Sequence, residues 1–201
     1  IEDGYFRRRI SLGRSYVILN GSIELSDKKI LKSGLDFTRY KLVADGTFRT
    51  VKSGYLQYRL LGIYSKGSLP YQSLYALPGN LDLLFQDLSF RTLQLNEIFG
   101  SSVVTLNLEH NFGDLIFRAL RVPGLMDWDI QLNTFFNAAY TEIGQETSAI
   151  LPVDVKAFKH PFYELGFGLS QVLLPLEIEF AWRLNYRGEN NFRVGIISHI
   201  L

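Results

Sequence analysis

The segment Leu176–Asn185, LEIEFAWRLN, alternates between apolar and polar residues along its length. Its apolar positions are Leu176, Ile178, Phe180, Trp182 and Leu184, and Glu177, Glu179 and Arg183 lie between them. Successive side chains of a β-strand point to opposite faces, so a period of two predicts a strand. One face would be as apolar as a membrane interior and the other charged. This polarity is typical of a transmembrane barrel strand, with lipid on one side and a hydrated lumen on the other.

The same alternation recurs along the chain and predicts an all-β, antiparallel transmembrane β-barrel. We expect further strands at Arg14–Leu25, Leu35–Thr50, Tyr55–Tyr64, Leu88–Ile98, Val104–Phe112, Trp128–Tyr140, Tyr163–Leu173 and Phe192–Leu201. The alternation in Leu88–Ile98 is poor, and Tyr5–Leu12 fits either a separate strand or the start of a longer one. No linker or low-complexity segment interrupts residues 1–201, so we expect a single barrel domain.

Two longer connections separate these strands. Gly144–His160 is expected to be a long outer loop, because such barrels place longer loops outside and short turns in the periplasm. Gly113–Asp127 is too apolar for a free loop, and we expect it at the barrel rim with one helical turn before Pro123.

Register gives the alternation an energetic meaning. A slip of one residue in Leu176–Asn185 would move Glu177, Glu179 and Arg183 to the apolar face. An arginine at the middle of a bilayer costs roughly 2–4 kcal/mol, and a carboxylate somewhat less. The strict pattern therefore favours a membrane setting.

Composition narrows the class of protein. The 201 residues carry a formal net charge of +1, without the basic excess that a nucleic-acid surface needs. The chain has no cysteine, which excludes thiol chemistry and fits an oxidising compartment. It also has no apolar run of the ~18 residues that suggest a membrane helix. Because it starts at Ile1 and shows no signal peptide, we interpret it as a mature chain or a C-terminal fragment.

Strand parity assigns candidate residues to each face. The charges expected to face the lumen are Arg59, Glu109, Glu164, Glu177, Glu179, Arg183 and Arg193. The residues expected in the lipid face or its aromatic girdles are Trp128, Tyr140, Tyr163, Phe167, Phe180 and Trp182. The charges fit either a conduction path or a salt-bridged lumen filling, and we favour the filling because neither sign dominates. Gly166 and Gly168 would either admit a lumen loop or mark a bend.

Residues for catalysis or metal binding are sparse. His110 shares the parity of Leu106 and Leu108 and opposes Glu109, so it is expected to be structural or interfacial. His160 and His199 lie in a loop and near the end of the chain, without metal-ligand spacing. Arg7–Arg9 is expected at a rim or headgroup region, with a partner contact as the alternative. We expect no enzyme activity, metal or cofactor.

Three segments resemble a known family: Gly67–Asn80, Ser89–Leu125 and Tyr163–Tyr186. They are similar to the outer-membrane insertase and translocase barrel superfamily, and more closely to bacterial outer-membrane proteins with a carboxypeptidase-like regulatory domain before the barrel. The resemblance implies the C-terminal part of a larger barrel, of sixteen strands in the full family member. The superfamily's lumen loop usually carries an Arg-Gly-aromatic motif, which this chain lacks.

The resemblance also implies a function. We expect a non-enzymatic scaffold or accessory in outer-membrane protein assembly or export, located in the outer membrane of a Gram-negative bacterium. Its partners would be outer-membrane lipid or lipopolysaccharide and other outer-membrane proteins in a complex, without nucleic acid. The alternatives are a passive or selective pore, an outer-membrane lipid-modifying enzyme and, for the fold, a soluble lipocalin-like binder. About eight to ten predicted strands would also fit a small closed barrel.

Overall fold

The computed structural model describes residues 2–3, 6–7, 15–27, 35–50, 54–81, 83–121, 130–151, 155–173, 176–188 and 190–198. The strands are β1 (Glu2–Asp3), β2 (Phe6–Arg7), β3 (Tyr16–Ser26), β4 (Asp36–Arg49), β5 (Tyr55–Ser68), β6 (Tyr75–Ala76), β7 (Phe99–Gly100), β8 (Ser102–Asn111), β9 (Gln131–Glu142), β10 (Phe162–Leu173), β11 (Leu176–Arg183) and β12 (Phe192–Ser198). The helices are the 3-10 turn η1 (Tyr71–Ser73), α1 (Leu115–Leu120) and α2 (Gln145–Ser148). The all-β class is confirmed.

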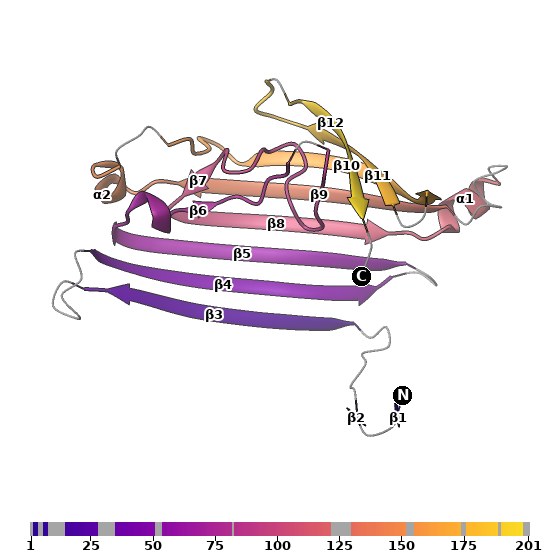
Figure 1. Ribbon diagram of the computed structural model, residues 1–201, viewed down its shortest axis with the longest axis horizontal. Helices are drawn as coiled ribbons and strands as arrows, with labels where there is room; N and C mark the ends of the chain where they lie inside the picture. Colours follow the sequence, from indigo (N-terminus) through magenta and orange to yellow (C-terminus); the bar gives the residue numbers. More distant parts are fainter. Residues whose placement is uncertain are drawn as a thin grey trace.

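One antiparallel sheet of eight strands dominates the molecule, in the order β12-β11-β10-β9-β8-β5-β4-β3 (Figure 1). Strands adjacent in this order follow one another along the chain, apart from the short β6–β7 pair between β5 and β8. The sheet is open, with β3 at one edge and β12 at the other. The described residues therefore do not form a closed eight-stranded barrel.

Most predicted strands are present, with small changes at their ends. The prediction of a strand at Leu88–Ile98 is wrong, because this segment is a series of turns and single bridges. Its alternation is poor because a segment of turns does not place every second side chain on the same face. The helical turn expected before Pro123 is present as α1, which ends where Arg121 adopts a left-handed conformation with φ of 51°. Most of Tyr5–Leu12 lies outside the described residues.

The segment Leu77–Ile98, here called the inserted loop, crosses one face of the sheet (Figure 1). We call the face that it covers the inner face and the opposite one the outer face. Ten buried apolar residues pack where this loop and the Gly144–His160 connection meet the sheet: Leu61, Ile63, Leu77, Phe90, Leu93, Ile98, Val103, Ala139, Phe158 and Phe162. The core therefore lies between the inserted loop and the sheet.

Polarity across the sheet is the reverse of that in a water-soluble sheet. On β10, inner-face Glu164 is 0% exposed, whereas outer-face Leu165 is 41% exposed. On β8, inner-face Asn107 is 1% exposed, whereas outer-face Val104 is 53% exposed. The same alternation gives β11 two buried glutamates between partly exposed apolar residues. On these strands buried polar groups share the inner face with the apolar core, and the outer face exposes apolar side chains.

Within the described part of the chain, no helix is both long and apolar enough to cross a bilayer.

Candidate functional site

The inserted loop is a compact structure held together by its own backbone. Its two ends meet where the Leu77 amide donates to the Ile98 carbonyl at 3.0 Å, and the Asn80 amide donates to the Leu93 carbonyl at 2.9 Å. The Asn80 side chain, 3% exposed, donates to the Phe90 carbonyl at 2.7 Å and accepts from the Gln86 amide at 2.9 Å. The loop therefore meets the sheet with a defined shape.

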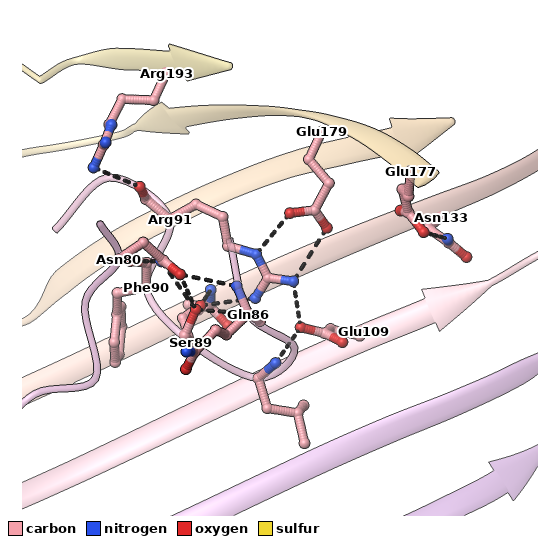
Figure 2. Close-up of polar contacts among 12 residues, drawn as sticks. Asn80, Gln86, Ser89, Phe90, Arg91, Glu109, Asn133, Glu177, Glu179 and Arg193 are labelled. Carbon is pink, nitrogen blue, oxygen red and sulfur yellow. Dashed lines mark hydrogen bonds and ion pairs between the residues drawn. The ribbon is translucent and has the colours of Figure 1, made fainter. Parts of the chain in front are cut away.

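Arg91 extends from this loop into the inner face, where it is 1% exposed (Figure 2). Its Nε and Nη2 donate to the two carboxylate oxygens of Glu179 on β11, at 2.9 and 3.1 Å. Nη2 also lies 2.7 Å from Oε1 of Glu109 on β8. The guanidinium carbon is 4.6 Å from the centre of the Phe135 ring. One loop arginine thus links strands from both sides of β9.

Glu164 on β10 binds the loop through its backbone. Its carboxylate accepts from the Arg91 amide at 2.8 Å, and from the Thr92 amide and hydroxyl at 3.0 and 2.5 Å. Asn137 on β9 donates to Glu164 at 2.7 Å and to the Ser89 carbonyl at 2.8 Å. Asn107 in turn donates to the Asn137 side-chain oxygen at 2.9 Å. Glu164 and Asn137 therefore bind loop backbone groups that would otherwise lack partners, and Asn107 supports Asn137.

Two further arginines bind loop carbonyls at the edge of this network. Arg183 Nη2 donates to the Thr92 carbonyl at 2.5 Å and lies 3.2 Å from the Glu97 carboxylate. Arg193 on β12 donates to the Arg91 carbonyl at 3.3 Å. The loop is thus anchored from β8 to β12.

Electrostatics keep the Arg91 guanidinium charged despite its burial. Removal from water alone would lower its pKa, but the carboxylates of Glu179 and Glu109 outweigh this, and the pKa of Arg91 is raised above its ordinary value. Arg91 and Glu179 are both buried, so removal of the arginine would leave a buried carboxylate without its counter-charge.

Of the seven charges predicted to share one face, the structure brings five to the inserted loop: Glu109, Glu164, Glu179, Arg183 and Arg193. Glu177 accepts from Asn133 on β9 at 2.5 Å, and Arg59 pairs with Asp45 on β4 at 2.7 Å. A polar cavity of about 120 Å³ lies beside Arg91's partners and is lined by Glu109, Glu177 and Glu179, among others. From β8 to β12 the inner face is thus covered by its own ion pairs and the loop, whereas the residues of β3 are exposed.

The apolar girdle candidates lie on the outer face. Phe167, Phe180 and Trp182 form an aromatic ladder. The centre of the Phe167 ring lies 5.1 Å from that of Phe180 and 5.7 Å from that of Trp182. Tyr140 and Tyr163 are 39% and 38% exposed. Trp128 lies outside the described residues.

Of the three histidine candidates, the structure describes His110 and His160. His110 lies on the outer face and bonds Thr50 Oγ1 at 2.8 Å, while the His160 amide contacts the Tyr186 hydroxyl. His199 and the side chains of Arg7–Arg9 lie outside the described part of the chain. Among the described residues, no group of three or more His, Cys, Asp or Glu could hold a metal ion.

The two predicted glycines accept neighbouring groups rather than the loop. A Cβ at Gly166 would overlap the Phe180 carbonyl and the Phe135 ring, and one at Gly168 would overlap Glu177. A third glycine, Gly195 on β12, is the one that admits the inserted loop, since a Cβ there would lie 2.5 Å from the Phe85 ring.

Sequence reasoning missed Arg91, Thr92, Asn107 and Asn137. Asn107 and Asn137 have the inner-face parity of Glu109 and face each other across β8 and β9. Their strand positions could have been found from that alternation. Arg91 carries no such signal. The alternation in Leu88–Ile98 is poor, so parity assigns Arg91 to neither face.

Neither a comparison with protein-family models nor a search of curated proteins gives a match for this chain. Function is therefore inferred from the polarity of the two sheet faces and from the inserted loop. The geometry offers tight anchoring of a loop on the inner face.

Proposed function

We propose that this sheet is part of the wall of a transmembrane β-barrel in a bacterial outer membrane. One observation carries the proposal: the same strands bury glutamate and asparagine and expose leucine and valine. Outer-face Leu19, Ile23 and Leu42 are 70%, 66% and 57% exposed. A contiguous apolar surface of this kind is unusual for a monomer in water, and matches a lipid-facing surface.

The open sheet supports a barrel larger than these eight strands. β3 presents an eleven-residue edge, and a membrane leaves no water to bond its backbone groups. Barrel closure satisfies such an edge, so the proposed barrel includes further strands next to β3. A total of about sixteen strands is what the family resemblance implies.

Within this barrel we propose a non-enzymatic scaffold or accessory role in outer-membrane protein assembly or export. The resemblance supports it, because Ser89–Leu125 and Tyr163–Tyr186 contain Arg91, Glu109, Glu164 and Glu179. These residues build the loop anchor, which makes the resembling segments the best-defined part of the inner face. Outer-membrane lipid or lipopolysaccharide and other membrane proteins are the proposed partners.

Depletion of the protein should change the composition of the outer membrane. We expect several other barrel proteins to fall in abundance while inner-membrane proteins stay constant, because an assembly factor acts on clients of one class. Quantitative proteomics of separated membranes measures this, with re-expression of the chain as the control. An outer-membrane proteome that does not change on depletion would exclude the assembly role.

A passive pore is the second candidate, favoured by the polar cavity beside the loop. For the assembly role we expect little steady current across a planar bilayer, since the inserted loop covers the inner face from β8 to β12. Replacing Leu77–Ile98 with a short Gly-Ser linker should produce stable open-channel steps. Large steady conductance of the unmodified protein, unaltered by loop replacement, would favour the pore.

A further inference from the structure

A groove of about 370 Å³ lies beside η1, where the inserted loop leads into β7. Its lining comes from η1, from the last turn of the inserted loop, from β7 and from residues 155–156, and we call it the η1 groove. Both β7 and α2 lie toward the end of the sheet opposite α1 (Figure 1). The volume is within the ~300–1,000 Å³ that is usual for small-molecule sites.

The turn that forms one part of this groove is held by several bonds. The Gln94 amide donates to the Glu97 carboxylate at 2.8 Å, and the Glu97 amide donates to the Gln94 carbonyl at 3.3 Å. Asn96 lies between them in a left-handed conformation, with φ of 55°. Arg183 Nη2 lies 3.2 Å from the Glu97 carboxylate, which ties the turn to β11. The turn is therefore preformed, and a ligand need not order it.

An exposed tyrosine supplies the aromatic part of the groove. Tyr71 on η1 is 39% exposed, and its ring centre lies 5.3 Å from that of Phe99, with the two rings tilted by 47°. The Phe99 amide donates to the Lys156 carbonyl at 2.9 Å, which joins β7 to the segment that carries Lys156. Contact with Phe99 restrains the tyrosine ring while much of it stays open to solvent. Such a ring offers a flat apolar surface at low entropic cost.

Polar side chains surround this ring. Gln94, Asn96 and Lys156 all line the groove and are exposed. A carboxamide both donates and accepts hydrogen bonds, and an ammonium group donates three. A sugar ring presents an apolar C–H face together with hydroxyls that donate and accept, so the groove matches both of its parts. An acyl chain would cover these polar groups without bonding them, which costs free energy.

We propose that the η1 groove binds a short saccharide chain, with one sugar ring stacked on Tyr71 and its hydroxyls bonded to the polar side chains of the groove. In the proposed barrel this end of the sheet carries the connection Gly144–His160, the expected outer loop, so the groove would open to the cell exterior. The saccharide comes either from lipopolysaccharide of the same membrane or from free oligosaccharide outside the cell. This inference goes beyond the assembly role and does not depend on it.

Oligosaccharide binding by the full chain in detergent micelles tests the proposal. The probes are an immobilised panel of linear glucan, mannan and galactan oligosaccharides and the delipidated oligosaccharide released from lipopolysaccharide. We expect a saccharide of this panel to bind, and Y71A to weaken its binding about ten-fold or more, because the stacking surface is lost. Y71F keeps the ring and should retain most of the affinity. Binding of only the delipidated oligosaccharide would assign the ligand to the membrane, and binding of a glucan, mannan or galactan would assign it to the exterior.

Tyr64 supplies the matched control for Y71A. It is 60% exposed but lies on the outer face of β5, away from the groove lining. Y64A should therefore leave saccharide affinity unchanged. The variant Y71W keeps a stacking ring and gives a local signal, since its fluorescence should shift to shorter wavelength when a sugar covers it.

Two results would overturn the saccharide site. One is the absence of binding to every oligosaccharide of the panel. The other is an equal effect of Y71A and Y64A on binding. If Y71A lowers the urea midpoint, the exposed-turn variant Q94A/N96A decides instead, and its unchanged affinity would contradict the site. Depletion proteomics tests the assembly role separately, so either proposal can fail alone.

Discussion

Replacement of Arg91 with alanine is expected to destabilise the folded protein by about 3–5 kcal/mol, because it leaves buried carboxylates without their counter-charge. Glu179 is 2% exposed and receives two hydrogen bonds from this guanidinium. Glu109 would lose its ion pair at the same time. Urea unfolding in micelles, followed by tryptophan fluorescence, measures the loss as a lower transition midpoint.

Arg59 provides a matched control on the same face. Its ion pair with Asp45 is 2.7 Å long, but the two side chains are 43% and 28% exposed. Water screens such a pair, so R59A is expected to cost no more than about 1 kcal/mol. R91K keeps the charge without the two parallel bonds and should lie between R91A and the unmodified chain. If R91A and R59A had equal effects, the central role of Arg91 would be refuted.

Placing an arginine at Leu106 is expected to cost about 2–4 kcal/mol in a lipid bilayer. Leu106 lies on the outer face of β8, midway along the strand and between Leu60 and Ala138 of the neighbouring strands. If that face contacts lipid, the guanidinium must enter hydrocarbon. Equilibrium unfolding from vesicles measures the cost.

Depth supplies the control for L106R. Tyr64 is on the same face but near the end of β5, and is 60% exposed. Near an interface the same arginine should cost only about 0–1 kcal/mol. A difference between L106R and Y64R therefore reports lipid contact rather than a general effect of charge. Equal, small effects of both variants would indicate that water covers the outer face and would contradict the barrel.

The sequence predicted the sheet well because alternation is a local signal. Glu164 and Leu165 are adjacent in the chain and point to opposite faces, so parity alone assigns each one. The faces of β8 to β12 follow in the same way. The reversed polarity of the two sheet faces could also be predicted, because it depends only on residue type and strand parity.

The loop anchor could not be predicted in this way. Arg91 and Glu179 are 88 residues apart, and Thr92 and Glu164 are 72 apart. No short-range pattern encodes such contacts, and the apolar residues of Leu88–Ile98 imitate a strand. They serve instead to pack the loop, with Phe90 and Leu93 in the core. The tertiary partners override the local preference.

The anchoring of the inserted loop also constrains the order of folding. Arg91 precedes all its carboxylate partners in the chain, and the last of them, Glu179, lies on β11. Long-range closure costs entropy before its contacts compensate for it, so local strand pairing forms more readily. The loop can be fixed only after β8, β10 and β11 are aligned. We therefore expect docking of Arg91 to be a late event in folding, one that reports correct registration of these strands.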